Sequence, residues 1–417
     1  MSDDILFLAH RIPFPPDRGD KIRSHHILKA IAALAPVHVG CLSESESDLA
    51  HEDALLELAA SYWMPPRSNP LPLAGIEAVL VGKPVSIVAF REASLMRWVE
   101  QVIAAHGIET IYVFSGQMGQ YIPRDFSGRI VLDLVDVDSA KFEAYAGTFR
   151  GPRRWLYERE GRLLARVERD LVARADLTLL VSEEEAGVLR QRVSECSTIR
   201  AMGNGIDCQL YSPDTALGDA SPYAGDGPHF VFTGQMDYPP NSDAVIRFAE
   251  KIFPAIRQEC PSAQFHIVGR APTARVQQLG TQDRDRVTVH GGVPDMLPYL
   301  AHADQIVVPL KIARGIQNKV LEAMAMARPV LLSPEAATGI GARHGEHFVI
   351  CENDDAFVEA ALSLIDWPQD AATVGKQARV FVCNKMSWPA ALADLPLFLG
   401  VADGSGTAHI SDQRDAA

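Results

Sequence analysis

Residues 307–331 read VVPLKIARGIQNKVLEAMAMARPVL, the strongest structural signal in the chain. The apolar start predicts a strand, Gly315 predicts a flexible turn, and the spacing over residues 317–327 predicts a helix. Amide N–H groups and the positive dipole end at such a helix start can bind an anion. Lys319 and Glu322 would share one helix face. Two interpretations stay open: Lys319 neutralises a phosphate while Glu322 accepts hydrogen bonds from a ribose, or the two form an ordinary surface pair.

The rest of the second half repeats the alternation of short apolar strands and helix-length segments. This pattern predicts a parallel sheet covered on both faces, in a Rossmann-like unit. We place a domain boundary near Gly205, and residues 211–228, rich in Ser, Pro, Asp, Gly and Ala, read as a linker or loop. The strands expected here are residues 230–233, 264–268, 287–290, 305–309, 329–332 and 347–350.

The first half shows the same alternation of strands and helices, which predicts a second Rossmann-like unit. Ser182 and Glu185 read as a capping box that opens a helix. Open parallel sheets bind ligands at the carboxyl ends of their strands, so two such domains would place the site in a cleft between them. The expected strands are residues 5–9, 37–41, 110–114, 130–135 and 177–181, and the expected helices are residues 24–34 and 154–175.

Composition narrows the class of protein. The 417 residues are 47% hydrophobic and 22% charged, which is typical of globular domains. The net charge of −14 argues against a nucleic-acid partner. The six cysteines lie far apart without zinc-ligand spacing, so we expect reduced thiols in a cytoplasmic protein.

Membrane insertion is not expected from the sequence. The N-terminus lacks a signal-peptide pattern, and the apolar residues 71–90 are too often broken by Pro, Gly and charge to span a bilayer. Peripheral contact with the cytoplasmic face of the inner membrane stays open, because this segment accompanies an arginine run. A solvated charged face is the alternative reading of that run: Arg150, Arg153, Arg154, Arg159 and Arg162.

Residues 322–325, Glu-Ala-Met-Ala, resemble the donor-site signature of family 4 glycosyltransferases. That family comprises retaining enzymes of GT-B fold, whose signature has two glutamates ahead of Ala-Met-Ala. The resemblance implies that Glu322 binds the nucleotide ribose. Arg314 stands where the family has its first glutamate, which leaves the contact to the donor sugar open: a different sugar, or a contact from the backbone of residues 315–318.

Other segments extend the resemblance in the right order along the chain. Gly203-Asn204-Gly205-Ile206-Asp207 is similar to the turn that ends the family's first domain, although a purely structural turn explains these residues as well. Gly234 and Asn241 lie in a segment that resembles the family's first donor-domain loop, where glycine lets the backbone approach the diphosphate. Gly269 follows the next strand and matches the family's second glycine turn.

The first domain contains a proline-rich loop and an aspartate that fit the same resemblance. The loop at residues 13–20 is similar to the family's acceptor-side glycine loop, or it is a rigid connector. Asp136, at a strand end, stands near the position where many relatives have a catalytic histidine. Asp136 and Asp138 also imitate the metal-binding Asp-x-Asp of GT-A enzymes, an interpretation that the two-domain pattern disfavours.

The resemblance implies an α/β protein of GT-B fold, with two Rossmann-like domains facing across a cleft. Residues 1–205 would form the acceptor domain, completed by a crossover at 385–400, residues 206–384 the donor domain, and 401–417 a disordered tail. The function implied is transfer of a sugar from a UDP- or GDP-sugar to a saccharide or lipid-linked acceptor with retention of configuration, without a cofactor or metal. The closest subgroup is that encoded with bacterial exosortase (PEP-CTERM) and exopolysaccharide systems.

Two other functions stay open, and one is disfavoured. A sugar-nucleotide epimerase has the same fold but needs acidic and histidine residues in the cleft, and a non-catalytic nucleotide-sugar-binding module would fit Arg314. No GxGxxG follows a first strand, which disfavours a dinucleotide oxidoreductase. The candidate site residues are Asp136 and Arg314 for catalysis; Gly234, Asn241, Gly269, Gly315, Ile316, Gln317, Asn318, Lys319 and Glu322 for the donor; and Arg18, Gly19 and Lys21 for the acceptor and phosphate loop.

Overall fold

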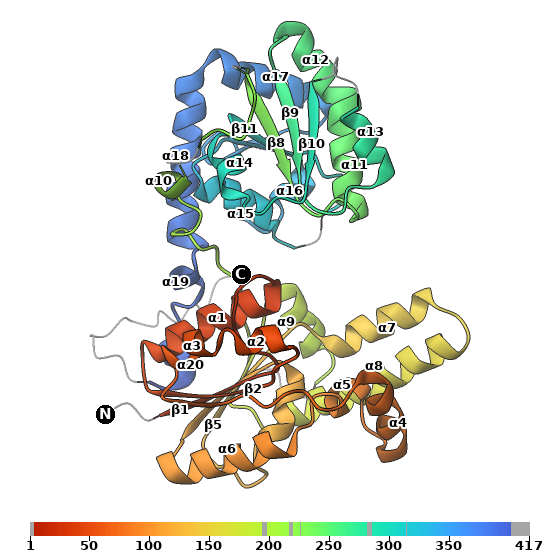
Figure 1. Cartoon of the computed structure of the whole chain (residues 1–417), viewed down its shortest axis with the longest axis vertical. Helices are drawn as coiled ribbons and strands as arrows, with labels where there is room; N and C mark the ends of the chain where they lie inside the picture. The colour runs from red at the N-terminus through yellow and green to blue at the C-terminus, as the bar shows by residue number, and fades with distance from the viewer. Residues whose placement is uncertain are drawn as a thin grey trace, which may run out of the picture. The chain divides into compact units, whose positions relative to one another are not determined.

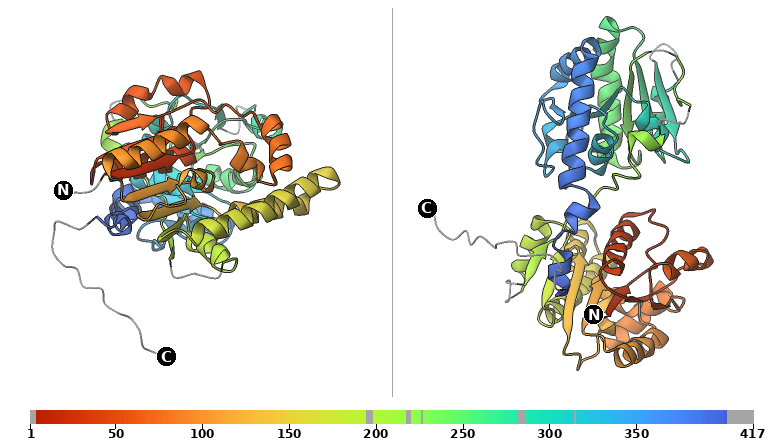
Figure 2. Two further views of the ribbon diagram at one scale, coloured as in Figure 1. Left: turned by 90° about the horizontal axis from the view of Figure 1, so that it is seen from below. Right: turned by 90° about the vertical axis from the view of Figure 1, so that its left-hand side faces the viewer.

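A computed structural model describes residues 4–193, 198–216, 220–225, 227–281, 286–313 and 315–401. The chain divides into two compact units (Figures 1 and 2). The first runs to Asn204 and takes up the chain again from Ala391, and the second runs from Gly205 to Ala390. We expected a disordered tail at residues 401–417, of which residues 402–417 lie outside the described residues.

The first unit is a seven-stranded parallel sheet in the order β3-β2-β1-β4-β5-β6-β7. The strands are β1 (Ile5–Ala9), β2 (Val37–Cys41), β3 (Ser61–Trp63), β4 (Thr110–Phe114), β5 (Arg129–Val135), β6 (Leu177–Leu180) and β7 (Ile199–Ala201). The helical elements are α1 (Gly19–Ala32), α2 (Glu46–Leu49), α3 (Glu52–Leu56), α4 (Leu71–Val81), α5 (Val85–Val88), α6 (Ala93–His106), η1 (Gly116–Tyr121), α7 (Asp138–Thr148), α8 (Pro152–Val172), α9 (Glu183–Arg190) and the returning α20 (Leu395–Leu399).

The second unit is a six-stranded parallel sheet in the order β10-β9-β8-β11-β12-β13. Its strands are β8 (His229–Thr233), β9 (Gln264–Val268), β10 (Val287–Gly291), β11 (Gln305–Val308), β12 (Val330–Leu332) and β13 (Val349–Ile350). Its helical elements are α10 (Pro213–Ala216), α11 (Pro239–Arg247), η2 (Phe248–Ile252), α12 (Phe253–Glu259), α13 (Ala274–Leu279), α14 (Leu297–Ala301), α15 (Asn318–Ala325), α16 (Pro334–Ala337), α17 (Asp354–Asp366) and α18 (Pro368–Lys385), while α19 (Trp388–Ala391) spans the division between the units.

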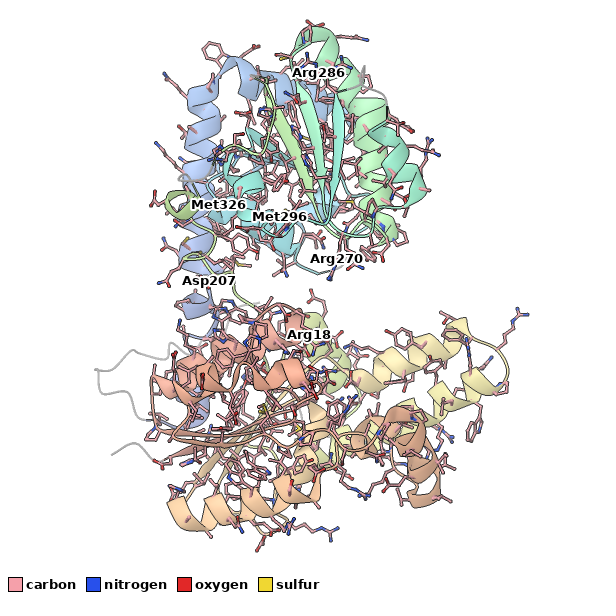
Figure 3. All side chains as sticks on the ribbon, in the orientation of Figure 1. Arg18, Asp207, Arg270, Arg286, Met296 and Met326 are labelled. Atoms are coloured by element: carbon pink, nitrogen blue, oxygen red, sulfur yellow. The ribbon has the colours of Figure 1, made fainter. Side chains whose placement is uncertain are left out.

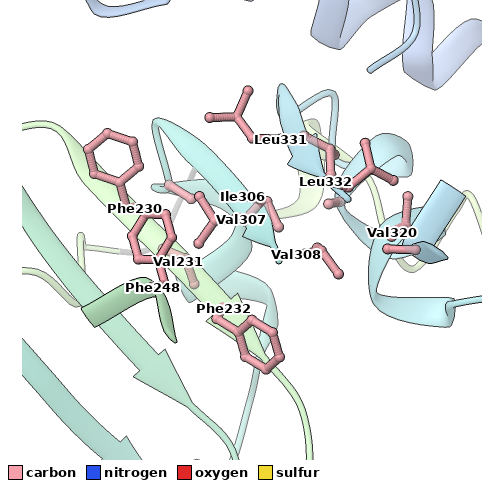
Figure 4. Close-up of a cluster of buried hydrophobic side chains, with 14 of the residues drawn as sticks. Phe230, Val231, Phe232, Phe248, Ile306, Val307, Val308, Val320, Leu331 and Leu332 are labelled. Atoms are coloured by element: carbon pink, nitrogen blue, oxygen red, sulfur yellow. The ribbon is translucent and has the colours of Figure 1, made fainter. Parts of the chain in front are cut away.

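Burial explains why the strands could be recognised from apolar runs. Strands β8 and β11 are buried at every position, as expected for central parallel strands covered by helices on both faces. Figure 4 shows part of this core, with Phe230 and Val307 on the central strands and Phe248 and Val320 on the covering helices. The expected fold class, two Rossmann-like parallel α/β domains, is confirmed.

Some local expectations were wrong. Helix α1 begins at Gly19 instead of residue 24. The Ser182 side chain accepts the Glu185 amide as expected, but the Glu185 carboxylate accepts the amide of Val137 in place of closing the capping box. The segment read as a linker contributes to the second core, because Tyr223 is 8% exposed and stacks on His266 at a ring-centroid distance of 4.1 Å.

Among the described residues, no helix is both long enough and apolar enough to cross a bilayer.

Candidate functional site

In the sheet of the second unit, the strand order reverses at the first strand, β8. Strand β8 pairs with β9 on one side and with β11, three strands later in sequence, on the other. Loops leave the carboxyl ends of β8 and β11 in opposite directions at such a switch point and leave a crevice there. The loop after β8 carries Gly234, and the loop after β11 leads into α15, so both predicted donor segments start at this edge.

The β8 loop and α15 meet through Lys319. Its Nζ donates to Asn241 Oδ1 at 2.6 Å and lies 4.4 Å from the centroid of the Phe232 ring. The Asn241 amide nitrogen in turn donates to the carbonyl of Gln235 at 2.8 Å, which holds the loop after β8. The three contacts fix the ammonium over the end of β8, where it meets an aromatic face and an amide oxygen. No carboxylate pairs with it among the salt bridges of the described residues.

Gly234 and Gly269 bring three strand ends close together. Gly234 has φ 152, and a Cβ there would lie 2.9 Å from Lys319 Nζ. Gly269 has φ 155, and a Cβ there would lie 1.6 Å from the carbonyl oxygen of Gly234. Both φ values lie where residues with a side chain are strained. Glycine at both positions therefore lets the ends of β8 and β9 pack closely against each other and lets the end of β8 pack against Lys319.

Glu322 lies one turn further along α15, half-buried. Burial raises the pKa of its carboxyl, against the opposing effects of Lys319 and of a hydrogen bond from the Tyr211 side chain. Tyr211 is placed by a turn at Asp207, labelled in Figure 3, whose carboxylate accepts two backbone amides. Arg379 on α18 also donates to the carbonyl of Tyr211 at 2.8 Å. The Glu322 carboxylate is therefore held in one orientation, with a lone-pair acceptor available beside the Lys319 ammonium.

Burial also lowers the pKa of Lys319, to about 8, and the nearby Glu322 only partly offsets this. The cause is the loss of hydration around the ammonium. A dianionic ligand at this position would raise the pKa of Lys319 again, because it favours the protonated form.

The remaining predicted donor residues form the entry to α15. Gly315 has φ 61, and Ile316 and Asn318 are exposed. Gln317 occupies the N-cap position of α15, and its side-chain amide donates to the carbonyl of Gly315 at 3.1 Å. No side chain caps this helix start, so its first amides face outward. Arg314 lies outside the described residues.

The acceptor-side residues lie after β1 in the first unit. Gly19 is the first residue of α1, and Arg18, labelled in Figure 3, precedes it. The Arg18 guanidinium is 48% exposed and pairs with Asp20 at 3.3 Å and with Glu44 at 3.2 Å. Lys21 is buried and donates to Asp48 Oδ1 at 3.0 Å and to the Phe14 carbonyl at 2.8 Å. The Lys21 charge is therefore neutralised inside the fold, while that of Arg18 reaches solvent.

The end of β1 carries a histidine that the sequence reasoning missed. His10 is 9% exposed, and its Nε2 lies 3.3 Å from Asp20 Oδ2. Burial lowers its pKa, against the opposing effect of Asp20. Its Nδ1 has no hydrogen-bond partner among the described residues. A histidine directly after a strand that pairs on both sides was the signal that could have identified it.

Asp136 follows Val135, whose φ of 68 is rare for a β-branched residue. Lys141 Nζ lies 2.6 Å from Asp136 Oδ2 and 3.6 Å from Asp138 Oδ1. A single ammonium thus lies against both carboxylates of the Asp-x-Asp sequence. Among the described residues, the one grouping with metal-ligand geometry is Asp4, His38 and His106, at the amino end of β1.

Comparison with known proteins gives one family match and several structural matches. Residues 227–366 match the family model described as glycosyl transferases group 1. HepE of Anabaena, solved with UDP and glucose, has a TM-score of 0.59 at 17% identity, covering 95% of this chain and 99% of its own. Sucrose-phosphate synthase of Thermosynechococcus elongatus has a TM-score of 0.60 at 18% identity, covering 95% of this chain and 98% of its own. A glycosyltransferase of Rickettsia africae has a TM-score of 0.62 at 12% identity, covering 97% and 100%.

These likenesses define the class of the fold as GT-B. The group 1 match falls on the unit that contains Gly234, Lys319 and Glu322. No curated protein matches the sequence at a significant level.

Proposed function

We propose that the protein is a glycosyltransferase that moves a sugar from a nucleoside-diphosphate sugar, UDP- or GDP-linked, to a hydroxyl acceptor. The observation that carries this proposal is the meeting of Gly234, Lys319 and Glu322 at the β8/β11 switch point. The three groups supply close backbone approach, a cation and a carboxylate. A nucleoside diphosphate needs these three: a place for the phosphates, a countercharge, and an acceptor for ribose hydroxyls.

Lys319 would stabilise the diphosphate as the bond to the sugar breaks. Negative charge develops on the leaving oxygen, so a fixed ammonium with little water around it lowers the barrier more than it strengthens ground-state binding. To do this, Lys319 exchanges its bond to Asn241 for one to phosphate. The uncapped amides at the start of α15 add donors on the same side.

Glu322 would hold the nucleoside. Its carboxylate, oriented by Tyr211, accepts hydrogen bonds from the two ribose hydroxyls, and buried charged acceptors form strong bonds of this kind. The resemblance of residues 322–325 to the family 4 signature supports the same role.

The finer parts of the proposal rest on that resemblance. They are transfer with retention, in which the leaving diphosphate oxygen takes the acceptor proton, and a role in cell-surface polysaccharide assembly on a saccharide or lipid-linked acceptor. No metal or cofactor is invoked. Arg18 is proposed to contribute to phosphate binding, and Asp136 to orient the acceptor or the sugar.

Titration calorimetry with UDP, GDP and their glucose and mannose conjugates tests the donor site. We expect wild type to bind one nucleotide series and Glu322→Ala to bind it about tenfold more weakly or worse. Glu359→Ala, on the exposed side of α17, is the matched control and should bind like wild type. Equal binding by wild type and Glu322→Ala would contradict the role of Glu322 in donor binding. In a separate product assay, release of an epimerised sugar without an acceptor would indicate an epimerase in place of a transferase.

A further inference from the structure

Helix α4 turns its small residues inward and its large aliphatic residues outward. Ala74 and Ala78 are fully buried in the core of the first unit. Leu73, Ile76 and Leu80 are 60%, 64% and 81% exposed. Their spacing places these three side chains on one side of the helix, which we call the α4 face. A surface helix normally buries its large apolar residues, so the α4 face has the pattern of a surface whose partner is outside the chain.

The apolar surface continues onto α8. Arg159 of α8 donates to the carbonyls of Ala78 at 2.7 Å and Lys83 at 3.2 Å, which joins α8 to the end of α4 (Figure 1). Trp155 lies four residues before Arg159, hence on the same side of α8 and one turn further out. It is 55% exposed, and Leu156 beside it is 41% exposed. An aromatic and an aliphatic side chain therefore extend the apolar surface beyond α4.

Positive charge borders this surface. Arg150, Arg153 and Arg154 are exposed in the turn between α7 and α8 and the first turn of α8, next to Trp155. Residues 150–166 contain six arginines and two glutamates, in a chain whose net charge is −14. Of those glutamates, Glu160 is buried and accepts the amides of Val85 and Ser86. Glu158 pairs with Arg154 at 2.7 Å, so Arg150 and Arg153 carry most of the charge offered to lipid phosphates. The basic segment is therefore a local exception to the sign of the whole molecule.

We propose that the α4 face and the basic segment dock on an anionic phospholipid bilayer. Helix α4 lies in the interface with Leu73, Ile76 and Leu80 among the acyl chains, Trp155 lies at headgroup depth, and the arginines contact lipid phosphates. Surface helices bind membranes without crossing them through three contributions: burial of aliphatic side chains, tryptophan at the interface, and attraction of arginine to lipid phosphates. This docking is independent of donor binding and would hold for a lipid-linked or a soluble acceptor.

A bilayer fits this surface better than a folded partner does. The three side chains of the α4 face are all aliphatic and form no hydrogen bonds. Specific protein interfaces, in contrast, combine apolar cores with polar contacts. A second copy of the chain would bring the same arginines against themselves at a two-fold interface, where like charges repel. Lipid phosphates, by contrast, complement them.

Cosedimentation with vesicles tests the proposal, with phosphatidylcholine alone and with about one-third phosphatidylglycerol as the two compositions. We expect wild type to bind the anionic vesicles, and binding to fall as salt rises to about 0.5 M. The variant Leu73→Gln/Ile76→Gln/Leu80→Gln should lower the partition coefficient about tenfold or more. The variant Arg150→Gln/Arg153→Gln/Arg154→Gln should lower it comparably on anionic vesicles and little on neutral ones.

A matched control separates the α4 face from general surface hydrophobicity. Trp367, Val380 and Leu397 are 65%, 61% and 69% exposed on other elements, and their triple change to Gln should leave vesicle binding unchanged. All variants should keep the thermal midpoint of wild type within about 2 °C, since exposed side chains contribute little to the fold. Calorimetric binding of the nucleotide should also be unchanged, so failure of this proposal is distinct from failure of the donor site.

Three outcomes would overturn the proposal. The first is no vesicle binding by wild type, and the second is equal binding by wild type and the α4 variant. The third is a wild-type dimer in sedimentation velocity that the α4 variant dissolves, which would assign the face to a second copy.

Discussion

The two sheets place different electrostatics at the same topological position. In the second unit, the switch point between β8 and β11 holds the half-buried ammonium of Lys319, which contacts an amide oxygen and an aromatic ring. In the first unit, the switch point between β1 and β4 leads to a crowded ion-pair network: Arg11, Arg18 and Arg67 pair with Asp20 and Glu44.

The difference concerns how much charge remains for a ligand. Cations that already have carboxylate partners gain little from an anion, because they exchange one partner for another. An ammonium with neutral partners and a lowered pKa gains the full interaction. We therefore expect the second unit to dominate diphosphate affinity, although the first unit has more arginines at the corresponding strand ends.

Gly269→Ala should have the largest effect, since it removes the second unit's strand-end geometry altogether. The new Cβ would lie 1.6 Å from the Gly234 carbonyl oxygen at a φ of 155. We expect a loss of about 3 kcal/mol or more in the free energy of unfolding, followed by chemical denaturation. Gly292→Ala is the control, because its Cβ would meet Arg270 at an ordinary 3.5 Å; similar behaviour of the two variants would contradict the close-approach argument.

Lys319→Met should weaken binding of UDP or GDP by about thirtyfold to a hundredfold, the value of a charge-assisted bond in a partly buried site. The methionine keeps most of the side-chain volume beside Phe232, so the fold should persist. Titration calorimetry measures the affinity, and circular dichroism checks the fold. Lys311→Met, at an exposed position before α15, should bind normally.

The pH dependence of nucleotide affinity tests whether the Lys319 ammonium supplies the charge that binds the diphosphate. The pKa of Lys319 is lowered to about 8, so the free protein loses this charge as pH rises through 8, while bound phosphate favours the protonated form. Affinity for the nucleotide-sugar conjugate, whose phosphates stay fully ionised in this range, should fall about tenfold between pH 7 and pH 9, where about a tenth of the free protein remains protonated. In Lys319→Arg the charge persists, so a flat profile is expected; a tenfold fall there as well would exclude Lys319 as the titrating group.

Arg18→Met should have the smallest effect on donor affinity, below about twofold, because its guanidinium already has two carboxylate partners. The free energy of unfolding should change by less than about 1 kcal/mol, as the side chain is half-exposed. A loss comparable to that of Lys319→Met would show that the first unit shares the diphosphate charge and would break the comparison.

The strands could be predicted because central parallel strands are buried on both faces and read as continuous apolar runs. Strands β3 and β7 escaped notice because each has only three residues at a sheet edge, and only one of their six positions is buried. The apolar pattern of α1 begins only at residue 24 because polar residues fill its first turn. In these cases the local pattern was too short or too polar to carry the signal.

The site was predictable where glycine or sequence spacing sets the chemistry, and not where tertiary contacts do. The glycines at 234 and 269 indicated a close approach of the backbone, and the structure packs the backbones of these two residues against each other. The Phe232 ring beside Lys319 and the Tyr211 bond to Glu322 join residues about a hundred positions apart, which no local pattern encodes. Lys21 likewise gave no sign that Asp48 would neutralise it. The roles assigned to the site residues stay predictions.

The return of the chain to the first unit has a consequence for biosynthesis. Arg129 of β5 donates to the carbonyl of Phe398 at 2.7 Å, and Leu395 and Leu399 are each 1% exposed. These contacts cannot form until the last residues have left the ribosome, long after the strands they cover. The second unit, continuous from Gly205 to Ala390, can fold first, while the earlier-synthesised unit waits with part of its core uncovered. Termination just after Ala390 would therefore leave the second unit complete and expose part of the core of the N-terminal unit.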